Sequence, residues 1–100
     1  MGEHHYYLYI VTNKQKNMLY IDVTTNLKHR IYEHEVGLIK GFSKKYYTHF
    51  LVYYEHFTKV GEAMERESVI KHWRSDKKKE LIESTNPTWN FLNEEIKRKL

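Results

Sequence analysis

The sequence predicts a single small domain of the α/β class, more narrowly α+β. Its expected core is a three-stranded, mainly antiparallel sheet flanked by helices in the order ββαβαα. Two observations predict this class: three short segments alternate with the period of a strand, and apolar residues recur at helical spacing around them. The 100 residues suffice for one core and not two. With a single proline and no repeat, we expect one domain over 1–100, with a core over about 5–92 and a charged tail over 93–100.

The first half of the chain predicts a β-hairpin followed by a helix. Residues 6–11 and 19–23 are rich in β-formers and are joined by the polar turn 12–17. Thr24 and Thr25 are suited to cap a helix over 26–36. Gly37 is suited to end it, because glycine adopts the left-handed conformation common after helices. Residues 38–47 are predicted to form a basic, irregular loop.

A third strand is predicted over residues 49–56. Strict alternation would place Phe50, Val52 and Tyr54 on one of its faces, with Leu51 and Tyr53 on the other.

Two helices are predicted after this strand. Gly61 precedes the first, which covers residues 62–73, and Ser75 or Asp76 can cap a shorter one that reaches about residue 84. The chain then breaks at Asn86, because a residue before proline avoids the helical region.

Composition narrows the classes of function. The net charge of +4 favours polyanionic partners, although a basic protein with no nucleic-acid role has the same charge. The lack of cysteine excludes disulfides, thiolate metal sites and a cysteine nucleophile. No apolar run approaches the roughly 20 residues that span a bilayer, and the N-terminus has no signal-peptide core. We therefore expect a cytoplasmic protein with no membrane partner.

The first helix carries a cation and an imidazole beside its apolar stripe. Leu27 and Ile31 define the stripe, while Arg30 and His34 lie four residues apart and share a face that borders it. These two side chains could hold a phosphate next to the sheet. Taken alone, the pattern fits a snorkelling arginine and a surface histidine better.

An acidic residue interrupts the buried stripe of the next helix. Ala63 and Ile70 mark that stripe, and Glu67 lies between them. Carboxylates are almost never buried without a partner. Arg30 or Arg74 would satisfy Glu67 as an ion pair, and a hard divalent cation such as Mg²⁺ would do so equally well.

The hairpin also gathers tyrosines. Tyr7 and Tyr9 share one face of the first strand, and Tyr20 lies on the second, so that Tyr9 and Tyr20 are expected to approach each other. Cross-strand aromatic packing explains this pair without any chemistry.

Together these positions resemble the GIY-YIG nuclease family. Tyr7-Leu8-Tyr9 stands where the family has its GIY motif, and Tyr20-Ile21-Asp22 stands where it has YIG, with ten residues between the two motifs. The family continues with an arginine and a histidine on the next helix and a glutamate on a later one, which correspond here to Arg30, His34 and Glu67. The resemblance extends to the family's small stand-alone bacterial members over nearly the whole chain, including residues 27–34, 70–74 and 86–89.

The resemblance implies a metal-dependent endonuclease that hydrolyses phosphodiester bonds, with DNA favoured over RNA and with structure-selective action in DNA repair or processing. It implies that Glu67 holds one Mg²⁺ or Mn²⁺ and that Arg30 holds phosphate oxygens. Tyr9 would act as general base or orient the water, His34 would act as base or proton relay, and Tyr20 would position phosphate or water. Asn86 would steady the site, with Asn90 as its competitor.

Basic residues supply the expected nucleic-acid contacts. The loop around residues 40–47 mixes lysines with aromatic side chains, which suits backbone contact with base stacking, although a solvated loop explains it equally. The loop lysines are Lys40, Lys44 and Lys45, and Lys28 on the first predicted helix is expected to add a further contact.

Two glycines of the family pattern are replaced. Tyr7 stands at the GIY glycine, a change that the small members tolerate. Asp22 stands at the final YIG glycine, where the absence of a side chain permits close approach. Its negative charge could repel a phosphate, or it could pair with Arg30 or Lys28. The alternative function is therefore a catalytically weakened GIY-YIG nucleic-acid-binding module.

Overall fold

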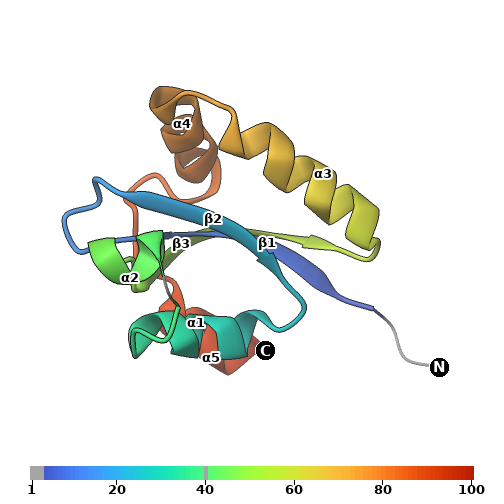
Figure 1. Cartoon of the computed structure of the whole chain (residues 1–100), viewed down its shortest axis with the longest axis horizontal. Helices are drawn as coiled ribbons and strands as arrows, with labels where there is room; N and C mark the ends of the chain where they lie inside the picture. Colours follow the sequence, from blue (N-terminus) through green and yellow to red (C-terminus); the bar gives the residue numbers. More distant parts are fainter. Residues whose placement is uncertain (1–3, 40) are drawn as a thin grey trace.

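The computed structural model describes residues 4–39 and 41–100. The α+β class and the three-stranded antiparallel sheet are confirmed, with strand order β2-β1-β3. Two helices lie on each face of the sheet, α3 and α4 on one and α1 and α5 on the other (Figure 1). Two helices are added to the predicted order. In chain order the elements are β1 (Tyr6–Thr12), β2 (Leu19–Thr24), α1 (Leu27–Glu35), α2 (Phe42–Tyr46), β3 (Phe50–Phe57), α3 (Val60–Lys71), α4 (Ser75–Thr85) and α5 (Asn93–Lys99).

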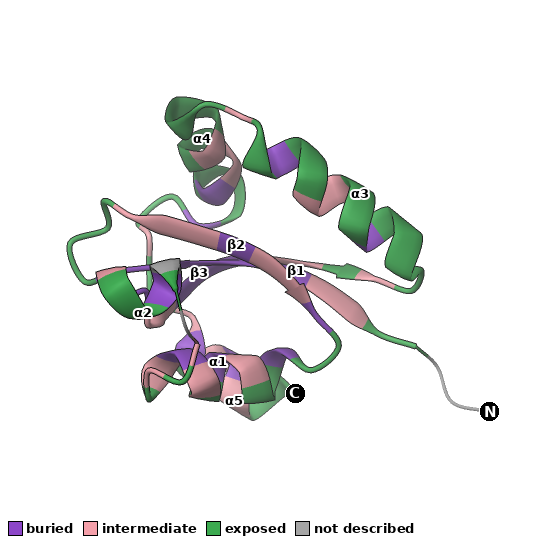
Figure 2. Ribbon diagram, in the orientation of Figure 1, coloured by how far each residue is buried: buried purple, intermediate pink, exposed green. Residues whose placement is uncertain are grey.

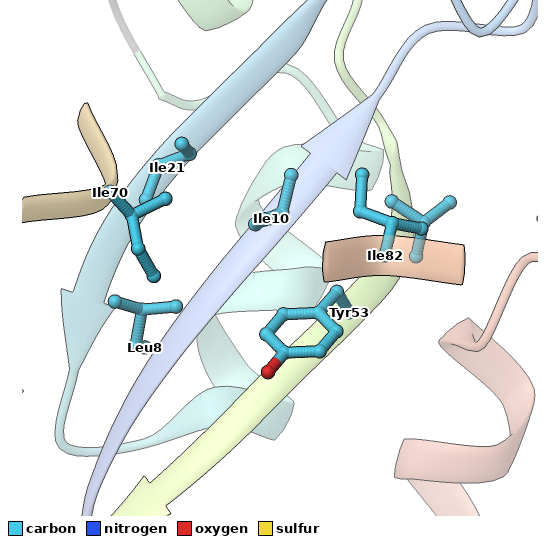
Figure 3. Packing of buried hydrophobic residues seen from close by; sticks show 7 residues of the cluster. Leu8, Ile10, Ile21, Tyr53, Ile70 and Ile82 are labelled. Atoms are coloured by element: carbon cyan, nitrogen blue, oxygen red, sulfur yellow. The ribbon is translucent and has the colours of Figure 1, made fainter. Parts of the chain in front are cut away.

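Both faces of the sheet are buried, so the central strand reads as a nearly continuous apolar run. The face toward α3 and α4 packs Leu8 and Ile10 against Ile21, Ile70 and Ile82 (Figure 3). The opposite face packs a second cluster, which consists of Tyr9, Val11, Leu27, Ile31, Leu51 and Ile96. Helix α3 turns its buried residues toward the sheet and leaves an exposed outer face (Figure 2). No helix of the described chain is both long enough and apolar enough to cross a bilayer.

A β-bulge in β3 overturns the predicted alternation of that strand. Ile10 pairs with Tyr53, but the next residue, Val11, pairs with Leu51, so that Val52 is the extra residue. Val52 and Tyr53 consequently pack into the same cluster, on the α3 and α4 side.

The two ends of α1 have specific caps. Asn26, and not the predicted threonines, is the N-cap, and its side chain accepts a hydrogen bond from the amide of His29. The prediction for Gly37 is confirmed: its φ of +75° allows its own amide and that of Leu38 to bond back to His34 and Glu33. These caps fix the phase of α1, and with it the direction of Arg30.

The segment predicted as an irregular loop contains the short helix α2 and a buried polar chain. His34 Nδ1 lies 2.8 Å from Ser43 Oγ, and the Ser43 hydroxyl bonds in turn to that of Thr48. This chain links α1 to α2 and to the start of β3. Every buried side-chain nitrogen or oxygen among the described residues has a hydrogen-bond partner.

Residues 93–100, predicted as a charged tail, instead form α5 and complete the core. Ile96 is fully buried. The side-chain oxygen of Asn93, Oδ1, accepts from the Leu51 backbone amide at 2.8 Å, and its side-chain Nδ2 donates to the His49 carbonyl and the Glu35 carboxylate. The closing helix is thereby fastened to both β3 and α1.

Because Ile96 fills the core beneath α1, we expect Ile96→Ala to lower the free energy of unfolding by about 2–5 kcal/mol. Urea denaturation measures this change, and Glu94→Ala, on the exposed face of the same helix, is the control. A loss below about 0.5 kcal/mol, the usual range for surface sites, would mean that α5 does not belong to the core.

Acidification should destabilise the fold because the buried His34 imidazole resists protonation. Burial, assisted by Arg30, lowers the pKa of His34 from 6.5 to about 4. Below pH 6.5 the unfolded chain therefore binds a proton that the folded chain refuses, and stability falls with falling pH. This contribution amounts to about 2 kcal/mol by pH 5.

The measurement is the free energy of unfolding at pH 7.5 and pH 5 for the wild type and for His34→Gln. The variant should lose less stability over this interval, because it lacks the titrating imidazole. Equal losses in the two proteins would show that His34 titrates normally.

Candidate active site

Two tyrosines and a histidine meet on the sheet face that α1 covers. The Tyr9 hydroxyl lies 2.9 Å from His34 Nε2. The Tyr20 ring lies 6.5 Å from that of Tyr9 and 5.4 Å from that of His34, measured between centroids. The predicted approach of the two tyrosines is confirmed. The expectation of a surface histidine is wrong, because His34 is buried between the hairpin and α2.

Arg30 lies over this group, near the open edge of the sheet. Its guanidinium interacts with the Tyr9 hydroxyl. Its Nε lies 3.2 Å from Glu33 Oε1, and its Nη1 lies 3.9 Å from Asp22 Oδ2. About a third of the side chain is exposed, so Arg30 is fixed by its neighbours while part of it faces solvent.

Glu67 reaches the same edge from α3, on the other side of the sheet. Its side chain is only 12% exposed, as the stripe predicted. The expected cation is present, but it is Lys71, whose Nζ lies 3.6 Å from Glu67 Oε2. Neither predicted arginine fills this role, since Arg30 pairs as described and Arg74 lies 3.8 Å from Asp76.

Asp22 is the residue at which the two sides meet. It lies opposite Tyr9 in the β1–β2 register, on the edge strand β2. Its Oδ2 accepts from the Tyr20 hydroxyl at 3.0 Å, and its Oδ1 accepts from the Val23 amide at 2.8 Å. Asp22 also contributes to raising the pKa of Glu67. From the sequence, Asp22 could either repel a phosphate or pair with Arg30 or Lys28. The pairing with Arg30 is found, and the influence of Asp22 on the pKa of Glu67 was not foreseen.

Burial and nearby charges shift the pKa values of the two tyrosines and the histidine and so determine which of them carry a proton at pH 7. Burial, with the charge of Asp22, raises the pKa of Tyr9 far above its ordinary value and that of Tyr20 to about 12. Both phenols are therefore protonated at pH 7, whereas His34 is neutral. The imidazole is consequently the proton acceptor of this group.

The two carboxyl groups are shifted in opposite directions. Burial raises the pKa of Glu67, and so does the hydrogen bond with Asp22. Burial also opposes ionisation of Asp22, but hydrogen bonds from Glu67, the Val23 amide and Tyr20 outweigh it and lower the pKa. Asp22 is thus the more readily ionised partner of the pair.

The structure does not bring Asn86 together with the other predicted site residues. Its amide group donates to the carbonyls of Val52 at 3.0 Å and Asn90 at 2.9 Å, and its side-chain oxygen accepts from the Asn90 amide at 2.9 Å. Val52 belongs to β3, which lies across β1 from the Asp22 edge. Asn86 fastens the turn after α4 to the sheet, and Asn90 takes part through its backbone.

The predicted nucleic-acid-binding lysines are exposed wherever the structure describes them. Lys28 lies on α1, and Lys44 and Lys45 lie on α2. Lys45 Nζ lies 5.4 Å from the centre of the Tyr46 ring. Lys40 lies outside the described residues.

The donor set at the β2 edge consists of carboxylates. Within the described chain, no three side chains of the histidine, cysteine, aspartate or glutamate types gather closely enough to enclose a metal ion. Two carboxyl groups are hard oxygen donors, and Mg²⁺ is commonly held by one or two carboxylates while it keeps water and phosphate oxygens. The residues present therefore fit such an ion.

Comparison with known proteins points to one family. Residues 5–80 match the model of the GIY-YIG catalytic domain. The chain is similar to the UPF0213 protein SH2523 of Staphylococcus haemolyticus, with 40% identity over 83 residues that cover 83% of this chain and 98% of that protein.

A solved structure gives the same result for the fold. The solution NMR structure of the UPF0213 protein BH0048 from Bacillus halodurans matches with a TM-score of 0.56 and 27% identity, over 85% of this chain and 89% of that one. Since the family match covers three quarters of the sequence, including both tyrosine motifs and Arg30, His34 and Glu67, the chain belongs to the GIY-YIG catalytic-domain family.

Proposed function

We propose that this protein is a metal-dependent endonuclease that hydrolyses phosphodiester bonds in DNA, with structure-selective action in DNA repair or processing in the cytoplasm. The observation that carries the proposal is that β1, β2, α1 and α3 bring five side chains to the part of the sheet around β2. These are Tyr9, Tyr20, Arg30, His34 and Glu67. Packing alone does not require a guanidinium, an imidazole and a carboxylate at the same edge.

In this proposal Arg30 binds the phosphate. Its guanidinium is oriented by Glu33, whose Oε1 lies 3.2 Å from Arg30 Nε. The contact with Asp22 is longer, at 3.9 Å, so a phosphate oxygen can replace it. The exposed Lys28, Lys44 and Lys45 add attraction for the flanking backbone. Tyr20, which is partly exposed, positions the phosphate or the attacking water.

Glu67 would hold one Mg²⁺ or Mn²⁺ at the β2 edge. Such an ion, when bound, neutralises charge that builds on the phosphate and on the leaving oxygen. The largely covered Glu67 carboxyl group, a hard oxygen donor 12% exposed, supports this assignment.

Proton transfer is assigned to the buried Tyr9–His34 pair. Tyr9 is fully covered, and its raised pKa excludes a phenolate at neutral pH. His34 is neutral, so its Nε2 can accept the Tyr9 proton while the Tyr9 oxygen accepts one from the site. Tyr9 thus acts as a relay instead of an independent base.

A second candidate function is a nucleic-acid-binding module with weakened catalysis. The observation that favours it is the set of contacts made by Asp22, which accepts from Tyr20 and pairs with Arg30. If this function is correct, Asp22 engages the Tyr20 hydroxyl and the Arg30 guanidinium, which would otherwise contact a phosphate.

The decisive assay is cleavage of branched, single-stranded and duplex DNA with Mg²⁺ or Mn²⁺. Glu67→Gln and Arg30→Ala should each reduce the rate by at least about 100-fold, because each removes a charge that acts on the phosphate. Glu62→Gln, a change of an exposed carboxylate on the same helix, is the matched control and should cleave like the wild type.

Binding without cleavage by the wild type, together with cleavage by Asp22→Gly, would instead support the weakened module. A wild type that neither binds nor cleaves any of these DNA forms would eliminate both functions.

Asn86→Ala should lower the stability of the fold without changing the rate of cleavage. The substitution leaves the Val52 carbonyl and the Asn90 backbone without their partner, so we expect a loss of about 1–3 kcal/mol in unfolding free energy. The cleavage rate per folded molecule should be unchanged at a temperature where the variant is fully folded. A large fall in that rate with an intact fold would show that Asn86 takes part in catalysis.

A further inference from the structure

A groove runs beside β2, from the candidate active site toward the β1–β2 turn. One cavity, of about 260 Å³, is bordered by Tyr20 and by Lys71 and Lys78. A second cavity, of about 320 Å³, lies between the residues of the turn and the first half of α4. Leu19 and Lys78 line both cavities, so the two adjoin. Together they form what we call the edge groove.

The lining of the edge groove is strongly basic. Lys16 comes from the β1–β2 turn, Lys71 is the last residue of α3, and Lys78 and Lys79 come from α4. In the part of the chain that the structure describes, no aspartate or glutamate lines either cavity. A concave surface lined by one sign of charge focuses the electrostatic potential. The edge groove is therefore suited to a polyanion.

The lysines of α4 differ in what they contact. Lys77 Nζ lies 4.4 Å from the centre of the Trp73 ring, away from the groove lining. Lys78 is half-buried in the groove, and neither Lys78 nor Lys79 has an ion-pair partner among the described residues. Covering part of an ammonium side chain without a counter-ion is unfavourable. A solvated helix face explains Lys77 and leaves the placement of Lys78 unexplained.

The other two groove lysines are free to change partners. Lys71 Nζ lies 3.6 Å from Glu67, and about half of the Lys71 side chain is exposed. Lys16 Nζ lies 5.1 Å from the centre of the Phe91 ring and is also exposed. Exposed ion pairs of the first kind are weak. Either ammonium can therefore turn to a phosphate at little cost.

Continuity with the active site identifies the polyanion. Tyr20 borders the groove, and its ring also lies 5.4 Å from that of His34 in the candidate active site. A DNA strand with one phosphate at that site would meet the groove with its neighbouring phosphates. Lysine acts on such phosphates as a point charge and reads no sequence.

We propose that the edge groove binds the phosphate backbone of DNA on one flank of the phosphate to be cut, through Lys16, Lys71, Lys78 and Lys79. The inference rests on the proposed function for the identity of the polyanion. Lys28 of α1 lies on the helix that covers the opposite face of the sheet, so the groove supplies a second and separate set of contacts.

The salt dependence of DNA binding tests the groove without reference to cleavage. Fluorescein-labelled duplex and single-stranded DNA are titrated with the full chain in EDTA at several KCl concentrations, and binding is followed by fluorescence anisotropy. We expect the double variant Lys78→Gln/Lys79→Gln to bind at least about 10-fold more weakly at low salt. The slope of log K against log salt should become shallower by about 1.4–1.8, because two phosphate contacts are lost.

The matched control is Lys59→Gln/Lys99→Gln. It removes the same charge at exposed positions outside the groove, on α5 and at the start of α3, and should keep the slope of the wild type. Circular dichroism checks that both double variants are folded.

The contrary outcomes separate the groove from the nuclease. Equal slopes and affinities in the groove variant and its control would overturn the groove, even if the wild type cleaves DNA. Groove-dependent binding by a protein that cleaves no DNA would retain the groove and reject the nuclease. A wild type that binds no DNA would overturn both. Tighter binding of a polyglutamate peptide than of DNA, lost in the groove variant, would assign the groove to an acidic protein segment instead.

Discussion

The hydrogen bond between the Tyr9 hydroxyl and His34 Nε2 is the interaction on which the rest of the site depends. It joins the central strand to α1 within the core, where neither group can exchange its partner for water. With Ser43 and Thr48 behind it, this bond fixes the rotation of α1 against the sheet. Arg30, one turn earlier on the same helix face, is thereby directed toward the β2 edge. Burial keeps the imidazole neutral, so one contact supplies both position and a proton acceptor.

The charges of the site are arranged outside this buried pair. Arg30, Asp22, Glu67 and Lys71 surround the open edge of β2, where helices from opposite faces of the sheet come within reach of each other. An edge strand is the only place in a three-stranded sheet where α1 and α3 can contribute to the same group of side chains. The sheet order therefore determines where the proposed phosphate and cation would be bound together, and it places Asn86 against β3, where its amide donates to the Val52 carbonyl.

Local patterns predicted the parts of the molecule that depend on local physics. The hairpin, the helical face shared by Arg30 and His34, the glycine that ends α1 and the covered position of Glu67 all follow from strand or helix periodicity. The bulge at Val52 was missed because five consecutive apolar residues give no sign of which one is extra. Helix α5 was missed because Ile96 stands alone among charges, and its partners lie far away in sequence. The influence of Asp22 on Glu67 depends on how α3 crosses the sheet, which no spacing reveals.

The most direct test of this account is the protonation state of His34 in solution. Nitrogen-15 NMR of the imidazole distinguishes the neutral tautomers from the imidazolium. The arrangement predicts a neutral ring from pH 7 down to about pH 5, with the proton on Nδ1 toward Ser43 and with Nε2 free to accept from Tyr9. An imidazolium at pH 6, or a proton on Nε2, would contradict the buried acceptor and with it the proposed relay.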